Sequence, residues 1–169
     1  GLLSTLRDLD LVDNFITGPI PEEICQLEDL QKLHLGDNWL SGVVPNCIGN
    51  IDSLLELTLR ENALEGTLPS QLSLLNELSV LLIDSNYFQG DPIAILDSLT
   101  YLETLMAHAN NFTGAIHDNF LQSHDRLEWA DLSDNHFFSS AFDTAIPSNL
   151  FLLERLQVLD LSGNKLQGS

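Results

Sequence analysis

Basic residues are scarce in this chain of 169 residues, which contains six Lys and Arg but 25 Asp and Glu. The formal net charge at pH 7 is therefore −19. A chain with this charge repels phosphate backbones and anionic lipid headgroups. Nucleic acid and bare anionic membrane surfaces are thus excluded as expected partners.

The sequence also lacks a long apolar run and a targeting leader. No stretch approaches the roughly 20 apolar residues that a membrane-spanning helix requires, and the chain does not open with a basic segment followed by an apolar one. We expect no direct membrane insertion within this segment, and any signal peptide or anchor should lie outside it.

Cysteine is rare too, because Cys25 and Cys47 are the only two in the sequence. Two cysteines are too few to form a disulfide framework, and their number does not identify the redox compartment. Apolar residues, in contrast, make up 44% of the chain, which is enough to fill a folded core. Disorder is therefore not expected.

One asparagine recurs at a regular interval along the whole chain. Successive copies are separated by 24, 24, 24, 24, 25 and 29 residues. The seven copies of this ladder are Asn14, Asn38, Asn62, Asn86, Asn110, Asn135 and Asn164. A shared period over seven copies indicates a repeat protein, in which each repeat packs only against its neighbours.

Each ladder asparagine follows a short alternating pattern, such as Leu33-His34-Leu35 before Asn38. Alternation with a period of two predicts a short strand whose leucines point inward and whose intervening residue points outward. Strands stacked at roughly 4.8 Å form a parallel sheet over a continuous core. The asparagine amide donates and accepts at once, so it can satisfy backbone groups where the chain leaves the strand.

A second pattern follows the asparagine, with a glycine and then a proline, as at Gly42 and Pro45. Glycine permits a backbone conformation closed to other residues, and proline ends the strand. Two apolar residues three positions apart come next, as at Ile48 and Ile51, and predict one helical or 3₁₀ turn on the other side of the coil. We therefore predict an α/β repeat solenoid in which residues 1–169 form a single array of about seven repeats.

The phrase Leu-x-x-Leu-x-Leu-x-x-Asn-x-Leu-x-Gly-x-Ile-Pro, nearly intact at residues 6–21, resembles the plant-type extracellular leucine-rich repeats. That family includes the ectodomains of receptor-like kinases and receptor-like proteins and the polygalacturonase inhibitors, and similar arrays occur in algae. The resemblance implies a right-handed horseshoe segment with a parallel β-sheet on its concave face and short 3₁₀ or irregular turns on its convex face. It also implies a second short strand beside the main sheet, and a secreted, extracellular or lumenal location, either as a free protein or as the ectodomain of a membrane protein. Both terminal caps are expected to lie outside this chain.

Three places depart from the repeat pattern. Residues 90–93 reverse the usual order and His117 replaces the expected proline, so we expect looser turns at both places. The sixth repeat is longer by about five residues, which predicts a loop over residues 138–145. Its Phe138 and Phe142 either lean over the concave face or fill a widened core.

Residues beside the inward leucines should project from the concave face, so that equivalent positions form columns across the repeats. Four apolar residues fall on adjacent strands, and three polar residues flank them. The predicted ligand-binding patch comprises Val80, Leu82, Met106, Trp129, Arg60, Asp84 and His108. An exposed apolar patch with Met and Trp inside an acidic surface is typical of a binding hot spot. Alternatively, segments outside this chain cover the patch, or its exposure is simply tolerated.

Asp84, His108 and Ser133 align on three consecutive strands in the order of acid, base and nucleophile. A working triad also needs hydrogen-bond contact, an oxyanion hole and a pocket, which an open sheet does not supply. Asp131 and Asp160 are neighbours in one column, but aspartate is usual there in the family, so a structural role is favoured over calcium binding. We therefore predict no catalytic activity, no metal site and no cofactor.

Two further features concern secretion. Asn111-Phe112-Thr113 is a glycosylation sequon at a solvent-facing turn, and it predicts a glycan on Asn111.

Cys25 and Cys47 lie in neighbouring outer turns but two positions out of register. A bridge would be geometrically marginal, so two half-buried thiols are favoured, and the sequence does not decide whether the two cysteines are bridged.

The predicted function is recognition without catalysis. The concave face or its edge is expected to bind a protein, a peptide or a glycan, as in the receptor and inhibitor families that the chain resembles. The alternative is a structural or accessory subunit of a larger acidic or extracellular assembly, in which the apolar patch is buried. Because of the net charge, partners should carry basic patches and association should slow as salt rises.

Overall fold

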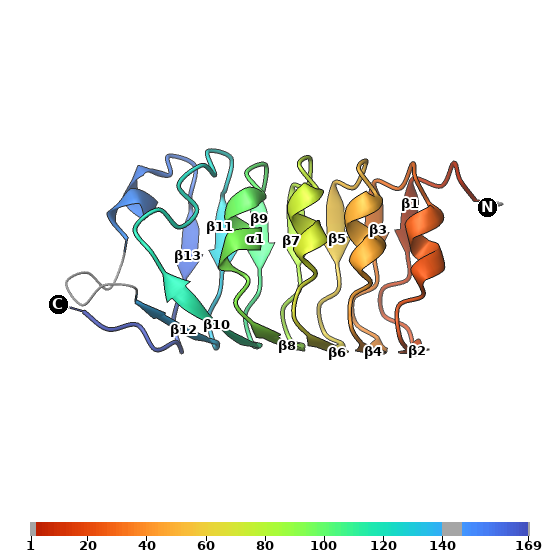
Figure 1. The fold of residues 1–169 in the computed structure, drawn as a ribbon, viewed down its shortest axis with the longest axis horizontal. Helices are drawn as coiled ribbons and strands as arrows, with labels where there is room; N and C mark the ends of the chain where they lie inside the picture. Colours follow the sequence, from red (N-terminus) through yellow and green to blue (C-terminus); the bar gives the residue numbers. More distant parts are fainter. Residues whose placement is uncertain (1–2, 140–146, 169) are drawn as a thin grey trace.

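The computed structural model describes residues 3–139 and 147–168, which form an elongated solenoid of stacked coils (Figure 1). A parallel sheet runs along one side of the stack, and short helical turns run along the opposite side. The predicted α/β repeat solenoid is therefore confirmed. Most of the loop predicted at residues 138–145, including Phe142, lies outside the described residues.

The main sheet contains seven parallel strands that follow one another in chain order. Its strands are β1 (Asp8–Asp10), β3 (Lys32–His34), β5 (Glu56–Thr58), β7 (Val80–Leu82), β9 (Thr104–Met106), β11 (Trp129–Asp131) and β13 (Val158–Asp160). The central residue of each strand is leucine except in β11, where it is Ala130. From β3 to β11 these central side chains are fully buried, because the alternation of the strand turns them all into the stack.

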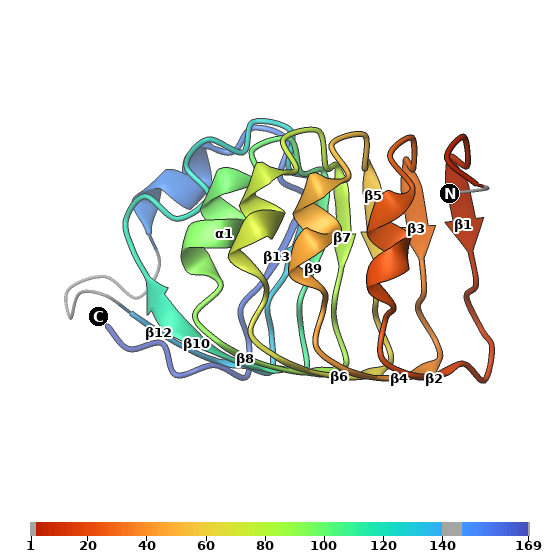
Figure 2. The same cartoon turned by 45° about the vertical axis from the view of Figure 1, so that its right-hand side comes forward.

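A second parallel sheet of six strands lies along one edge of the solenoid, where Figure 2 shows it below the helical turns. Its strands are β2 (Thr17–Gly18), β4 (Trp39–Gly42), β6 (Ala63–Gly66), β8 (Tyr87–Gly90), β10 (Asn111–Ile116) and β12 (His136–Ser139). The first four end in the glycine of the second sequence pattern, as at Gly42, whose φ of 76° disfavours other residues. The second strand that the family resemblance implied is thus present.

The turns opposite the main sheet are mostly 3₁₀ helices, and a proline precedes each of them. They are η1 (Glu22–Gln26), η2 (Asn46–Asn50), η3 (Ser70–Leu74) and η4 (Ser148–Leu152). The fourth repeat instead forms a short α-helix, α1 (Ile93–Ser98). The N–H of Ile93 donates to the Asp91 carboxylate at 2.9 Å and so starts this helix. The looser turn predicted at residues 90–93 is therefore wrong, whereas residues 118–123, which follow His117, form turns and no helix.

The core is a column of aliphatic side chains that becomes aromatic toward the C-terminal half. Phe88, Phe112 and Phe137 each follow a ladder asparagine by two positions and are fully buried. Their rings stack along the solenoid, with centroids 6.0 and 6.3 Å apart. Since each ring contacts the next, this part of the core is continuous from coil to coil.

The asparagine ladder ties each coil to the preceding one. The Nδ2 atom of Asn86 donates to the Leu59 carbonyl of the preceding coil at 3.0 Å, and to the Asp84 carbonyl of its own coil at 3.0 Å. Its Oδ1 atom accepts the N–H of Leu64, in the preceding coil, at 3.0 Å. The predicted double role of the amide is therefore present, and it satisfies backbone groups that would otherwise be buried without partners.

Cys25 and Cys47 form a disulfide between η1 and η2, with their Cα atoms 5.8 Å apart. The prediction of two free thiols was therefore wrong. Equivalent positions of two stacked 3₁₀ turns point in the same direction, so they do not face each other. Two residues that face each other across adjacent turns therefore occupy different positions of those turns. Since a 3₁₀ helix has three residues per turn, Cys47, which lies two positions before the equivalent of Cys25 in the next coil, points in a different direction from Cys25 and can meet it.

Candidate functional site

The outward surface of the main sheet, called the sheet face below, corresponds to the predicted concave face. Strand pairing places the variable residues in the predicted columns. Leu82 lies beside Met106 across the β7–β9 pair, and Trp129 lies beside Thr104 across the β9–β11 pair. Because the pairing is parallel and in register, neighbouring repeats present equivalent side chains side by side.

We call the four predicted apolar residues the apolar patch: Val80, Leu82, Met106 and Trp129. Leu82 and Met106 are direct cross-strand neighbours, and Trp129 lies on the next strand, beside Thr104. Trp129 is 43% exposed, and the other three are half-buried. Thr104 separates Val80 from Trp129 in their column, since it pairs with both. The patch therefore spans three strands and combines a large aromatic side chain with a Met, as binding hot spots often do.

Basic side chains on the N-terminal side of the patch are held by acidic ones. The Arg60 guanidinium lies 3.1 Å from the Asp37 carboxylate of the preceding coil, and it reaches that coil over Gly36, which has no side chain to block it. Lys32 lies 2.6 Å from Glu56. Hydrogen bonding and attraction from Glu56 raise the pKa of Lys32. The predicted contact residue Arg60 is thus oriented away from the apolar patch and toward Asp37.

His108 lies between two carboxylates just beyond the end of β9, the middle strand of the patch. Its Nε2 atom is 3.6 Å from Asp84 and its Nδ1 atom is 3.4 Å from Asp131. The side chain of Asp84 is buried, and this burial raises the pKa of its carboxyl group, although the nearby His108 acts in the opposite direction. The structure thus brings Asp84 and His108 together as expected.

Ser133, the third member of the aligned trio, does not contact the histidine as a nucleophile would. Its hydroxyl donates to the Asp131 carboxylate at 2.6 Å, and its backbone N–H donates to the same oxygen at 3.0 Å. The hydroxyl proton of Ser133 is therefore engaged by the carboxylate of Asp131, two residues earlier in the same coil. A nucleophile activated by a base needs the opposite arrangement, with the hydroxyl on the imidazole.

The paired aspartates serve the local turns. Asp131 and Asp160 are neighbours across the β11–β13 pair, and each accepts the N–H of the serine two residues further along its own chain. The hydroxyl and N–H of Ser162 together lower the pKa of Asp160. Within residues 3–139 and 147–168, no group of three or more His, Cys, Asp or Glu is arranged to hold a metal ion.

Asn111, the predicted glycosylation site, is the first residue of β10 and is exposed. It lies in the second sheet, at the position directly after the ladder residue Asn110. Its side chain therefore belongs to the edge of the solenoid, apart from the sheet face. The attachment of a glycan there stays a prediction.

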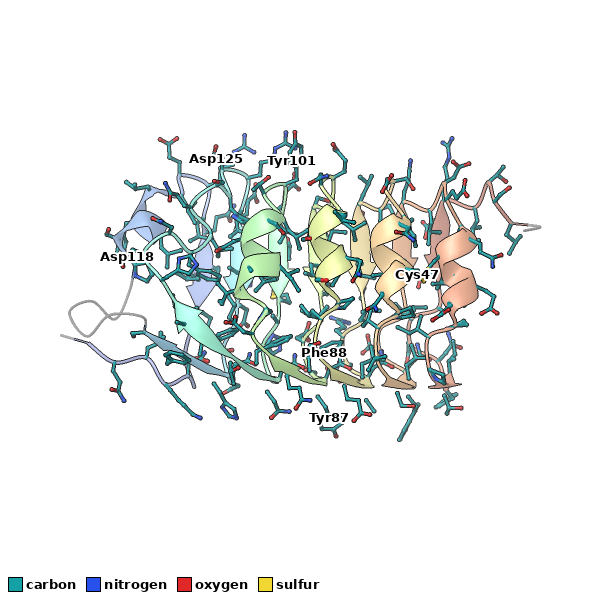
Figure 3. All side chains as sticks on the ribbon, in the orientation of Figure 1. Cys47, Tyr87, Phe88, Tyr101, Asp118 and Asp125 are labelled. Carbon is teal, nitrogen blue, oxygen red and sulfur yellow. A yellow bond between two sulfur atoms is a disulfide. The ribbon has the colours of Figure 1, made fainter. Side chains whose placement is uncertain are left out.

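Sequence reasoning missed a row of exposed aromatic residues on the same edge. Phe15, Trp39 and Tyr87 are 88%, 66% and 62% exposed, and each directly follows a ladder asparagine. Figure 3 shows Tyr87 projecting away from β8, while Phe88 points into the core. The signal was present in the sequence, because this position is the first residue of every second-sheet strand from β4 to β12 and alternation turns it outward, whereas Phe15 lies two residues before β2.

A buried histidine was also missed. His124 is fully buried beside α1, and its Nε2 atom lies 3.0 Å from the Leu96 carbonyl oxygen. No hydrogen bond to its Nδ1 atom is present in the part of the chain that the structure describes. Burial lowers the pKa of His124, which is therefore held neutral.

Comparison with known families and proteins agrees with this architecture. The family model described as Leucine Rich Repeat matches residues 5–27, 29–51 and 155–169. A search of curated proteins finds no match. Among the described residues, no helix is long and apolar enough to cross a bilayer.

Several solved structures are similar over nearly the whole chain. The ectodomain of the Arabidopsis thaliana membrane receptor kinase GASSHO1/SCHENGEN3, in complex with CASPARIAN STRIP INTEGRITY FACTOR 2, is 31% identical with a TM-score of 0.90, over 97% of this chain and 19% of that one. The ectodomain of the Arabidopsis receptor kinase HAESA, in complex with an IDA peptide hormone, is 31% identical with a TM-score of 0.87. The match covers 96% of this chain and 26% of that one. A plant ice-binding protein is 30% identical with a TM-score of 0.78, and the match covers 95% of this chain and 50% of that one.

This chain thus spans from about a fifth to half of the length of these proteins. The two receptor structures are extracellular domains, and a disulfide such as Cys25–Cys47 persists in oxidising compartments. Both observations support the predicted extracellular location. The repeat pattern, the two parallel sheets and these similarities identify the chain as a member of the leucine-rich-repeat family, with repeats of the plant extracellular type.

Proposed function

We propose that the chain is a recognition module whose sheet face binds an extracellular peptide or protein. The observation that carries this proposal is the apolar patch, in which Trp129 and Met106 lie on adjacent strands inside an acidic surface. Aromatic side chains at the centre of an interface contribute much of the binding energy. Similar ectodomains that bind peptides, such as that of HAESA, support the same assignment.

The partner should carry basic groups near an apolar anchor. The net charge of −19 attracts cationic partners over a distance comparable to the Debye length, roughly 8 Å at physiological ionic strength. Asp84 and Asp131 border the patch and are close to only one histidine. A basic residue that follows an apolar residue in the partner would therefore meet a carboxylate next to the patch.

The proposal is tested by selecting peptides that bind the chain from a displayed library of secreted peptides, and then by measuring their dissociation constants by calorimetry. Trp129→Ala should weaken binding by about 2 kcal/mol, or roughly 30-fold. Leu74→Ala is the matched control, since Leu74 is also an exposed apolar residue but belongs to η3. Equal affinity of wild type and Trp129→Ala, with unchanged circular dichroism, would place the site away from the sheet face.

Two further results bear on the nature of the partner. The association rate of a selected peptide should fall as NaCl rises from 50 to about 500 mM, because electrostatic steering is screened. A flat salt dependence would contradict steering. If the chain instead bound neutral oligosaccharides and Trp129→Ala abolished that binding, a glycan would replace the peptide as the ligand.

A structural role is the second candidate, favoured by the apolar residues Phe151 and Leu152 of η4, which are 77% and 76% exposed. Side chains of this kind are covered when a chain is a permanent subunit of an assembly. Purification of the chain from its source in a complex of fixed stoichiometry, with Phe151 protected from solvent, would support this role. A monomer that binds a selected peptide through Trp129 would support recognition.

A further inference from the structure

A cleft of about 300 Å³ opens on the second-sheet edge, between Trp39 of β4 and Tyr87 of β8. Ala63 of β6, the equivalent residue of the coil between them, lines the same cleft. The two aromatic residues belong to coils two steps apart, and they are staggered along the strands, because Ala63 pairs with Ser41 and Tyr87 pairs with Glu65. The small side chain of Ala63 does not fill the space between the two large rings, which stays open as this cleft.

The exposure of these rings is not required by the fold. The core side of the same strands is filled by other residues, since Leu40, Leu64 and Phe88 are the buried neighbours of the cleft residues. Trp39 and Tyr87 are 66% and 62% exposed. Two large rings that remain exposed beside a cleft are a feature typical of a binding site.

Carboxylates supply the charge of this cleft. Glu61 lines it two residues before Ala63, and Glu65 pairs in register with Tyr87 across the β6–β8 pair. Within the described residues, neither carboxylate forms an ion pair. The adjacent Arg60 is already held by Asp37 at 3.1 Å, so this cation does not reach over to them.

The remaining polar groups of the cleft are occupied by the fold. The amide of Asn62 donates to three backbone carbonyls and accepts the N–H of Leu40. Asn38 is bonded in the same way. The hydroxyl of Ser85, which also lines the cleft, donates to the Asp84 carboxylate at 3.5 Å. The two side-chain amides are therefore not available to hydrogen-bond a neutral, hydroxyl-rich ligand. The groups of the cleft that remain available to a ligand are the aromatic rings and the carboxylates.

We propose that this edge cleft binds the cationic head of an arginine or lysine side chain from a basic polypeptide, with the stem of that side chain between Trp39 and Tyr87. Aromatic faces and carboxylates both attract organic cations. A bound cation also relieves the repulsion between carboxylates in a chain of net charge −19. The site is separate from the sheet face and does not depend on the apolar patch.

The test uses Trp39 as its own reporter. The chain has two tryptophans, Trp39 and Trp129, so Trp39 is the only source of tryptophan fluorescence in the Trp129→Phe protein. Titration with tri-arginine amide should change this fluorescence in a saturable way. Tri-citrulline amide, whose side chains are uncharged isosteres of arginine, should bind at least about tenfold more weakly, because these side chains lack the charge that a cation–π contact requires.

Variants in the same background assign the binding to the cleft. Glu61→Gln and Tyr87→Ala should each weaken tri-arginine binding by about five- to tenfold. Glu77→Gln is the matched control, since Glu77 is an exposed carboxylate after η3, in another part of the coil. This control removes the same charge from the chain and should leave the dissociation constant nearly unchanged.

Three outcomes would overturn the proposal. Equal weakening by Glu61→Gln and Glu77→Gln would show that the probe senses only the summed charge of the chain. Equal binding of the arginine and citrulline peptides would show that charge has no role. A saturable response of Trp39 to a neutral oligosaccharide such as cellotetraose, without a response to tri-arginine, would assign the cleft to a glycan.

Discussion

The Nε2 atom of His108 lies 3.6 Å from the Asp84 carboxylate of the preceding coil. Asp84 is 6% exposed, so its carboxyl group is largely removed from water. Burial raises the pKa of this carboxyl group above its ordinary value of 3.8. The pair therefore makes the stability of the sheet face dependent on pH.

We expect Asp84→Asn to be more stable than the wild type at pH 7. A carboxyl group whose pKa is raised by folding contributes stability below its ordinary pKa, and this contribution is lost as the pH rises through the raised value. The advantage of the variant should therefore grow between pH 4 and about pH 7 in urea unfolding. Asp160→Asn is the opposite control: the pKa of Asp160 is lowered in the fold, so removal of its charge should reduce stability at neutral pH.

His124 should make the protein sensitive to acid. Burial lowers its pKa below the ordinary value of 6.5, so the unfolded state binds a proton more readily than the folded state. Stability is then present above pH 6.5 and is lost as the pH falls below it, by up to about 1.4 kcal/mol per pH unit. Urea unfolding at several pH values should show that the free energy of unfolding of His124→Gln depends less steeply on pH than that of the wild type.

Loss of a central ladder asparagine should cost far more than loss of a terminal one. Asn86→Ala leaves backbone groups of two coils without partners in the interior, and we expect a loss of about 3 kcal/mol in the free energy of unfolding. Asn14 is exposed, and the two carbonyls that its amide contacts belong to its own coil. Asn14→Ala should therefore cost less than about 1 kcal/mol. Similar losses for both variants in chemical denaturation would contradict the proposed role of the amide between coils.

Reduction of the Cys25–Cys47 bridge should destabilise the first two coils. The bridge closes a segment with a separation of 22 residues, for which constraint of the unfolded chain predicts about 3 kcal/mol. Cys25→Ser with Cys47→Ser should show this loss without addition of a reductant, and mass spectrometry of the wild type should find no free thiol. Alkylation of both cysteines in the unreduced protein would contradict the bridge.

The period of the ladder asparagine was sufficient to predict the main sheet and its columns. Since each coil has nearly the same length, equivalent residues such as Leu82 and Met106 must lie side by side. The same reasoning failed for Cys25 and Cys47, because contact between two helical turns joins positions that are not equivalent. Periodicity identifies which residues share a column, but it does not identify which ones face each other across adjacent turns.

The edge cleft could have been found from the sequence only in part. The aromatic residues directly after Asn38 and Asn86 were visible, but their exposure depends on the second sheet, whose strands the sequence pattern did not locate. His124 could not be found, because its environment comes from α1 of the preceding coil. Contacts between neighbouring coils at irregular positions depend on side-chain packing, which no repeat pattern encodes.

The Cys25–Cys47 bridge also has a mechanical consequence. Coils of a solenoid are held only by their neighbours, so tension applied at the N-terminus should peel them off one at a time. The bridge fastens the first helical turn to the second, and the chain before Cys25 can unravel without lengthening the segment between the two cysteines. In an optical trap, the first extension step should therefore be shorter in the oxidised protein than after reduction, by about the length of that enclosed segment.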